Sequence, residues 1–212
     1  MEGAGSRPGP LSRPGGSVAG VGFVEDGERI HLETVEEWRA WLAANHSRDD
    51  GVWLVGWRTP TGRPSVPYEE AVEEALCVGW IDATARTVDD ERTMQWYAPR
   101  KPGSMWAATN KARVERLERE GRMTPAGRAL VEQARADGSW TLLDAVERLE
   151  VPDDLAAALD DRPGAREHWD GSSASSRKLA LTWLVQAKRP ATRATRVETV
   201  VERCARGEKP GG

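Results

Sequence analysis

Residues Trp80–Tyr97 read WIDATARTVDDERTMQWY, and this stretch decides the fold class. Trp80–Val88 has the pattern of an extended segment, Asp89–Arg92 is a short polar turn, and Thr93–Tyr97 is a second extended segment. Two such segments joined by a polar turn are typical of a β-hairpin. We therefore expect an antiparallel hairpin late in the N-terminal half of the chain.

Further elements are expected on the N-terminal side of the hairpin. Val52–Trp57 is another β-type run, closed by the turn residues Thr59–Gly62. Thr34 followed by Glu37 is a capping box, which predicts the start of a helix. A second helix is expected to open at Pro67, because proline suits the first turn. Its spacing predicts that it buries Tyr68, Ala71, Val72, Ala75 and Leu76 and exposes Glu69, Glu70, Glu73 and Glu74.

From Ser104 onward the pattern is helical. Ser104 is expected to cap one helix, and Thr124–Pro125 is expected to begin the next. A longer helix should open at Ser172–Ser173, and Pro190 should separate it from the last one. These two helices are expected to bury Leu179, Trp183, Val197, Val200, Val201 and Cys204. The fold class predicted is α+β, with a small antiparallel sheet in the N-terminal half and a helical C-terminal half.

The chain of 212 residues is long enough for one large domain or two small ones. Residues 1–22, rich in Gly, Pro, Ser and Arg, should form a disordered leader that can be removed without loss of stability. Residues 23–209 should form a single domain, with an α/β part over 23–103 and a helical part over 104–209. No segment has the apolar length of a membrane span, so we expect a cytoplasmic protein without membrane insertion.

The charge is unevenly distributed along the sequence. The formal net charge is −4, and residues 25–95 carry sixteen acids against seven bases. Residues 99–122 carry seven bases against three acids, and residues 186–206 carry six against two. Two basic stretches in an acidic protein suggest anion binding, although the overall acidity argues against a nucleic-acid binder.

Tryptophan dominates the aromatic composition, with ten of the thirteen aromatic residues. Trp80 and Asp82 are two residues apart in extended backbone, so their side chains should share one face of the strand. Trp106 closely follows Arg100 and Lys101. An indole beside an ionic group can hold a ligand by stacking and charge together.

These considerations give a candidate binding site drawn from three segments. Bases just before a helix N-terminus form an anion site, and arginines three residues apart can share a helix face. The ligand-binding candidates are Trp80, Arg100, Lys101, Ser104, Trp106, Asn110, Lys111, Lys188, Arg193 and Arg196. Asp82 is the one candidate for catalysis. We expect Trp80, Asp82, Arg100, Trp106 and Lys188 or Arg193 to line a common pocket.

No standard catalytic or metal-binding motif is present. The sequence lacks a GxSxG elbow, a phosphate-binding Walker loop, a Gly-rich dinucleotide turn and an HExxH motif. Cys77 and Cys204 lie far apart, and we expect both to be small buried hydrophobic residues. The sequence therefore predicts neither a metal nor a cofactor, and it predicts no particular oligomeric state.

Several of the same segments resemble a known family. They are Cys77–Asp82, Ala98–Trp106, Asn110–Lys111, Gly121–Met123 and Ala187–Arg193. In this order they are similar to the YdeI/OmpD-associated, or bacteriocin-protection, family, with a resemblance that spans about residues 23–209. The resemblance implies a role in protection against bacteriocins and cationic antimicrobial peptides, and it implies no catalytic residues. The family name refers to an outer-membrane porin, whereas the N-terminus shows no export signal.

Three functions remain open at this stage. The first is a cytoplasmic stress or antimicrobial-resistance protein that binds a small anionic or aromatic ligand, or a peptide, in a pocket lined by Trp and Arg. The second is an enzyme in which Asp82 acts as general acid or base to inactivate a reactive antibiotic. The third is nucleic-acid binding through the basic segments 100–122 and 188–206.

Overall fold

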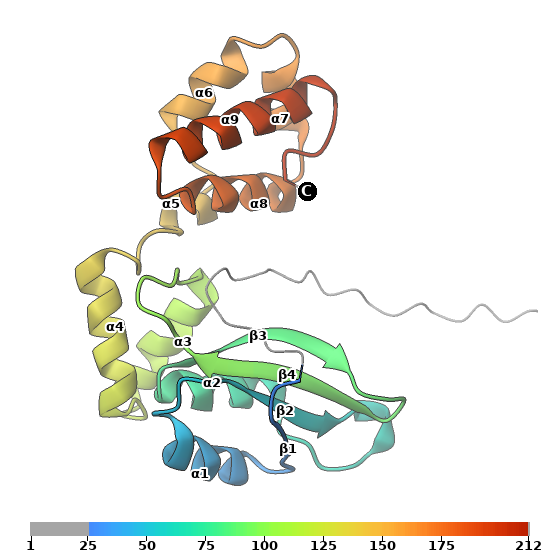
Figure 1. Ribbon diagram of the computed structural model, residues 1–212, viewed down its shortest axis with the longest axis vertical. Coiled ribbons are helices and arrows are strands. Elements are labelled where there is room, and N and C mark those ends of the chain that lie inside the picture. Colours follow the sequence, from blue (N-terminus) through green and yellow to red (C-terminus); the bar gives the residue numbers. More distant parts are fainter. Residues whose placement is uncertain (1–25, 212) are drawn as a thin grey trace, which may run out of the picture. The chain divides into compact units, whose positions relative to one another are not determined.

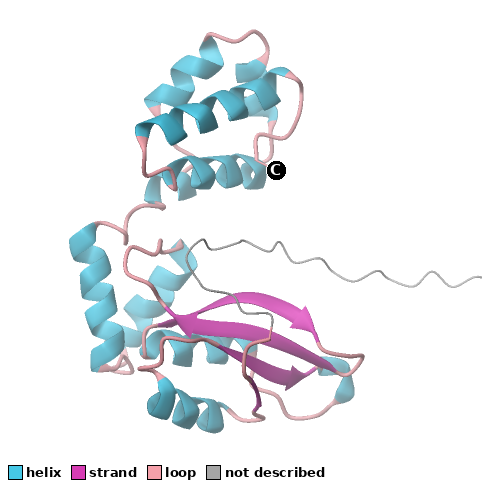
Figure 2. Cartoon of the chain, viewed as in Figure 1, coloured by secondary structure: helices cyan, strands magenta, loops and turns pink. Residues whose placement is uncertain are grey.

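The computed structural model describes residues 26–211, and the predicted leader lies outside the described residues. The chain forms two compact units that are not consecutive along the sequence. Unit 1 holds the described residues up to Ala75 together with Trp80–Pro99, and unit 2 holds Leu76–Gly79 together with the chain from Arg100 onward. Figure 1 gives the elements in chain order, and Figure 2 distinguishes helices from strands.

Unit 1 is built on a four-stranded sheet with the strand order β1-β2-β4-β3. Its strands are β1 (Arg29–His31), β2 (Val52–Trp57), β3 (Trp80–Thr87) and β4 (Arg92–Pro99). The predicted hairpin is confirmed, since β3 and β4 pair antiparallel. β4 also pairs antiparallel with β2, and the short β1, which the sequence pattern did not reveal, pairs parallel with β2.

Two α-helices accompany this sheet, together with the short helical turn η1 (Thr59–Thr61). α1 (Val35–Asn45) begins with the predicted capping box, and α2 (Tyr68–Cys77) follows the predicted proline. The two helices are joined by a hydrogen bond of 3.0 Å, which the indole N–H of Trp38 donates to the carbonyl of Ala71.

The burial expected along α2 is partly wrong. Tyr68 is 45% exposed, whereas Glu73 and Glu74 are buried. Glu74 can be buried because Arg39 reaches its carboxylate with two hydrogen bonds of 2.8 and 2.9 Å. Helical spacing alone predicts a solvated carboxylate at Glu74, but the ion pair with Arg39 allows this carboxylate to be buried.

Unit 2 is helical, as expected for the C-terminal half. Its elements are α3 (Ala108–Arg119), α4 (Pro125–Asp137), α5 (Asp144–Glu147), α6 (Asp153–Asp160), α7 (Ala165–Gly171), α8 (Ala174–Val185) and α9 (Pro190–Ala205). The caps predicted at Thr124 and Ser173 are confirmed. The cap predicted at Ser104 is wrong, because α3 begins four residues later with Ala107 as N-cap and no side-chain cap. The Ser104 hydroxyl instead donates to the Lys101 carbonyl at 2.5 Å, which closes the preceding turn.

The C-terminal helices share a hydrophobic core of their own. It contains Leu155, Leu159, Trp169, Leu181, Leu184 and the four residues predicted for α9, Val197, Val200, Val201 and Cys204. The expectation for α8 is wrong, since Leu179 is 53% and Trp183 37% exposed. The buried face of α8 consists instead of Ser176, Ala180, Leu181 and Leu184.

The end of α2 is fixed to the start of α4 within unit 2. The carbonyl of Cys77 accepts hydrogen bonds from the backbone N–H and the hydroxyl of Thr124, at 2.9 and 2.8 Å. Gly127 lies so close to this carbonyl that a Cβ atom would collide with it. Residue 127 therefore has to be glycine for α4 to approach Cys77 this closely.

Candidate functional site

The predicted residues of the 100–106 loop contact one another. Arg100 is 5% exposed, and its guanidinium lies 3.6 Å from the ring centre of Trp106. It also donates a 2.9 Å hydrogen bond to the carbonyl of Met105. Trp106 packs in turn on Trp140, with the ring centres 4.9 Å apart. Arg100 and Trp106 therefore stack on each other, whereas the sequence analysis expected both of them to hold a ligand.

Little space remains beside this cluster. The cavity there has a volume of about 10 Å³ and is lined by Arg100, Lys101, Ser104, Trp106 and residues of α4 and its C-terminal end. A single water needs roughly that much room. In this conformation the loop holds at most about one water rather than an organic ligand.

Lys111 and Asn110 in α3 have protein partners, and Lys188 is exposed. Lys111 forms a 2.6 Å ion pair with Asp144, and Asn110 accepts a 2.6 Å hydrogen bond from Arg113. None of these three contributes a free charge to an enclosed cavity together with Arg100.

Arg193 and Arg196 likewise interact with the helices around them. Arg193 forms two hydrogen bonds with Asp154, of 2.6 and 2.8 Å. These bonds hold the pKa of Asp154 below its usual range and raise the pKa of Arg193. Arg196 lies 5.0 Å from the ring centre of Trp183 and donates to its carbonyl. Neither arginine lines the cavity beside Arg100.

Trp80 and Asp82 belong to unit 1, whereas the other nine predicted residues belong to unit 2. Trp80 is fully buried, and its indole N–H donates a 3.0 Å hydrogen bond to the carbonyl of His46. It is therefore a core residue. Asp82 is half-buried and accepts a 2.8 Å hydrogen bond from the hydroxyl of Tyr68.

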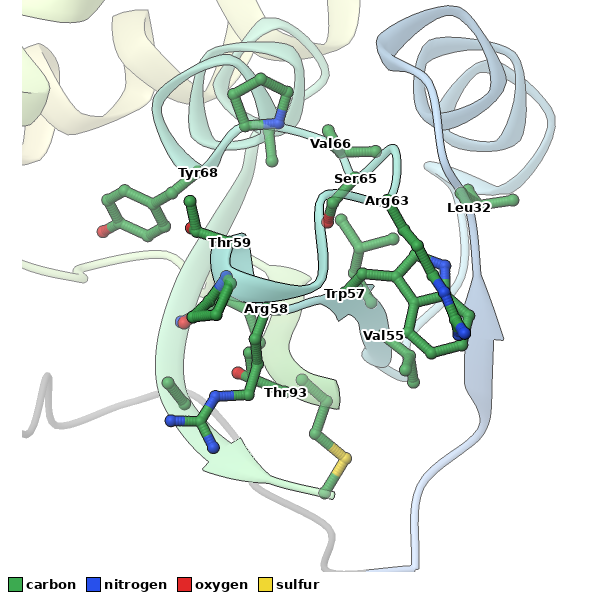
Figure 3. Close-up of a pocket in the computed structure, with 18 of the residues that line it drawn as sticks. Leu32, Val55, Trp57, Arg58, Thr59, Arg63, Ser65, Val66, Tyr68 and Thr93 are labelled. Carbon is green, nitrogen blue, oxygen red and sulfur yellow. The ribbon is translucent and has the colours of Figure 1, made fainter. Parts of the chain in front are cut away.

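A much larger cavity lies elsewhere in unit 1, between the strands β2 and β4, the loop that follows β2 and the start of α2 (Figure 3). Its volume is about 770 Å³. Small-molecule sites typically enclose about 300–1,000 Å³. The lining residues are Leu32, Leu54, Val55, Gly56, Trp57, Arg58, Thr59, Pro60, Gly62, Arg63, Ser65, Val66, Pro67, Tyr68, Ala71, Ala85, Thr93, Met94, Gln95 and Tyr97.

The charge of this lining differs from that of the surrounding sequence. It includes two arginines, Arg58 and Arg63, and no acidic residue. Among the described residues, the guanidinium of Arg58 has no ion-pair or hydrogen-bond partner. Arg63 contacts Glu91 at 3.4 Å and lies 4.3 Å from the ring centre of Trp57. Figure 3 shows the side chains of Arg63 and Trp57 next to each other. Arg58 is therefore the lining cation available to a ligand.

Trp57 is held on several sides. Besides Arg63, Arg92 lies 5.9 Å from its ring centre, and His31 makes an edge contact at 4.8 Å. Its indole N–H donates a 3.1 Å hydrogen bond to Glu33. Trp57 therefore serves as a fixed wall of the cavity.

The loop that carries both arginines is stiffened by its sequence. Pro60, Pro64 and Pro67 each restrict the backbone, and Ser65 packs so closely on Gly56 that a Cβ atom there would collide with its hydroxyl. Such a loop restricts the backbone that carries Arg58, which lowers the ordering cost of binding.

Sequence reasoning missed this site. The sequence pattern identifies Thr59–Gly62 only as a turn and Trp57 only as a strand residue. The available signal was Trp57–Arg58 at a strand end, directly before a loop with three prolines and a second arginine. A Trp–Arg pair there deserves the same interpretation as the pair at Arg100 and Trp106.

Residues 26–211 contain no group of three or more His, Cys, Asp or Glu side chains placed to hold a metal ion. In the same range no helix combines the length and apolar character needed to cross a bilayer.

Comparison with known proteins divides the chain in two. Residues 30–130 match a domain of unknown function (DUF8412). Residues 148–207 match the family described as bacteriocin-protection, YdeI or OmpD-associated. No curated protein and no solved structure matches the chain. Of the segments that suggested this family, Ala187–Arg193 lies within the second match and the others lie within the first. The C-terminal helices of this chain, residues 148–207, thus resemble the bacteriocin-protection, YdeI or OmpD-associated family.

Proposed function

We propose that this protein is a cytoplasmic stress or antimicrobial-protection protein that binds a small, anionic, partly apolar molecule in the cavity of unit 1. The observation that carries the proposal is the lining of that cavity, with two arginines and no acid. Residues 25–95 as a whole carry sixteen acids and seven bases. A cavity of the opposite charge within an acidic region favours an anionic ligand.

Arg58 is the proposed anchor for the anionic group. Its guanidinium can donate two parallel hydrogen bonds to a carboxylate or phosphate, and such charge-assisted bonds are stronger than neutral ones. Thr59, Ser65, Thr93 and Gln95 add neutral polar groups around the same cavity. The apolar remainder of the lining would receive the body of the ligand.

The protective role rests on the family of residues 148–207. In this proposal, unit 1 supplies the ligand site and the C-terminal helices supply the region shared with protection proteins. The proposed ligand site and the segment that resembles this family thus lie in different parts of the chain.

Calorimetric titration of the full chain can test the ligand site. The probes are phenylacetate and cyclohexylacetate, each compared with its neutral alcohol, phenylethanol or cyclohexylethanol. We expect at least one acid to bind about tenfold more tightly than its alcohol, and Arg58→Gln to remove that difference. Arg29→Gln is the matched control, because Arg29 is an exposed arginine of unit 1 outside the cavity lining. An equal loss in both variants, or no preference for either acid, would refute the site.

One observation favours the enzymatic alternative. Asp82 accepts a hydrogen bond from Tyr68, and Tyr68 lines the cavity. The carboxylate of Asp82 could therefore act on a bound ligand through the phenol of Tyr68.

No comparable observation favours nucleic-acid binding, because bases such as Lys111 and Arg193 in the two basic segments are already paired with acids.

A further inference from the structure

The aromatic residues of the unit 1 cavity are already engaged by other parts of the protein. Arg63 lies over Trp57 at 4.3 Å, and His31 and Arg92 approach the same ring. Tyr97 is 1% exposed and packs on Trp38, with the ring centres 5.1 Å apart. Arg63 therefore occupies a face of Trp57, and Tyr97 is too deeply buried to offer its ring to a ligand.

Tyr68 is the remaining aromatic residue of the lining. Its hydroxyl is directed to Asp82 by the 2.8 Å hydrogen bond. Figure 3 shows its ring pointing away from Trp57, at the far side of the labelled residues. A flat ligand ring beside Trp57 could therefore not stack on Tyr68 at the same time.

The rest of the apolar lining is aliphatic and comes from every element around the cavity. β2, β3 and β4 provide Leu54, Val55, Ala85 and Met94, and the loops and α2 provide Leu32, Pro60, Val66, Pro67 and Ala71. Methyl and methylene groups stabilise a ligand by the area they bury, without a preference for a flat ring. An aromatic ligand gains beyond its buried area where it can stack on another ring or meet it edge to face.

We infer that this cavity selects anions whose apolar part is aliphatic, and that Arg63 excludes aromatic bodies by covering the face of Trp57. The inference rests on the proposed function, since it specifies the ligand class of the same site. Arg58 holds the anionic group, the aliphatic wall holds the body, and Arg63 determines the selectivity between the two kinds of body.

The test compares two acids that share carboxylate, connectivity and number of carbon atoms. Cyclohexylacetate and phenylacetate are titrated into the full-length protein and into Arg63→Ala, with Arg29→Ala as the matched control. We expect cyclohexylacetate to bind more tightly in the unaltered protein. In Arg63→Ala the ratio of the affinity for cyclohexylacetate to that for phenylacetate should fall about fivefold, because the exposed indole of Trp57 can then stack with the phenyl ring.

The change in this affinity ratio between the two proteins is the informative quantity, because any general preference of apolar surfaces for the more hydrophobic ring is the same in both. Loss of the Arg63 charge affects both acids alike and also leaves the ratio unchanged. A ratio that stays the same in Arg63→Ala, or phenylacetate binding as tightly as cyclohexylacetate in the unaltered protein, overturns the inference. If Arg58→Gln still weakens both acids, the proposed function survives that result; if Arg58→Gln affects neither acid, the proposed function fails as well.

Discussion

Asp82 is the residue at which binding and catalysis can be separated. Its carboxylate accepts the hydrogen bond of Tyr68, whose ring lines the cavity of unit 1. We expect Asp82→Asn to keep most of the protection in a sensitive host challenged with a bacteriocin, because the amide oxygen can still accept that bond. Asp82→Ala should lose most of it, because the hydroxyl of Tyr68 then loses the hydrogen bond that it donates to Asp82.

The opposite result would favour the enzyme. A general acid or base typically contributes about 10²–10⁴ in rate, and asparagine cannot exchange the proton. Complete loss in both variants, with unchanged melting temperatures, would therefore favour proton transfer by Asp82. Tyr68→Phe completes the set, since it removes the hydroxyl and keeps the ring.

Arg193 is informative about stability rather than ligand binding. It joins α9 to Asp154 in α6 by two hydrogen bonds, and it also donates to the carbonyl of Leu184 at the end of α8. The ion pair is partly exposed, so Arg193→Gln should lower the free energy of unfolding by only about 1 kcal/mol at pH 7.

The pH dependence of that difference follows from the pKa of Asp154, which lies lower in the folded than in the unfolded protein. A carboxylate with a depressed pKa stabilises the fold above its unfolded pKa of about 4, and the contribution is lost as the pH falls through the folded pKa. Urea unfolding should therefore show a smaller difference in the free energy of unfolding between Arg193→Gln and the unaltered protein near pH 3 than at pH 7. A gap that widens in acid would exclude this pairing as its source.

At the scale of elements, the contact between α4 and the end of α2 is the most restrictive packing feature. A Cβ at position 127 would collide with the carbonyl of Cys77, so Gly127→Ala should lower the free energy of unfolding by about 1–3 kcal/mol. Gly171→Ala is the control, because Gly171 ends α7 with open space around it and alanine restricts the unfolded chain. Chemical denaturation should give Gly127→Ala a lower free energy of unfolding than the unaltered protein and Gly171→Ala an equal or higher one.

The sequence predicted elements better than it predicted the side chains that they bury. Caps at Thr34, Thr124 and Ser173 and the break at Pro190 are local signals, and all four were confirmed. The burial of α8 was predicted wrongly, because its composition is apolar on more than one side and only packing selects the buried face.

The candidate site could be predicted only in kind. The candidate rested on arginine beside tryptophan, and this pattern occurs both at Arg100–Trp106 and at Trp57–Arg63. In the first case the side chains fill the space between them, and in the second they border a cavity of about 770 Å³. Which of the two remains open depends on how distant segments pack, which sequence spacing does not record.

At the scale of the whole molecule, the two units interleave along the chain. Residues 76–79 belong to unit 2, although unit 1 continues to Pro99. A fragment of residues 26–99 would therefore lack Thr124 and Gly127, the partners of Cys77. We expect it to melt without a cooperative transition, whereas residues 26–137, which retain α3 and α4, should unfold cooperatively in calorimetry or circular dichroism. Equal cooperativity in the two fragments would show that these partners are dispensable.

The same interleaving bears on how the protein can change over evolutionary time. Because the path enters unit 2 at Leu76, returns to unit 1 at Trp80 and leaves it again after Pro99, no recombination at one chain end can add or remove unit 1 cleanly. The helices of residues 148–207, by contrast, form an unbroken stretch that holds nearly all of one hydrophobic core. A gene can exchange that stretch as a single block, and the cavity of unit 1 can then be inherited independently of the helices of residues 148–207.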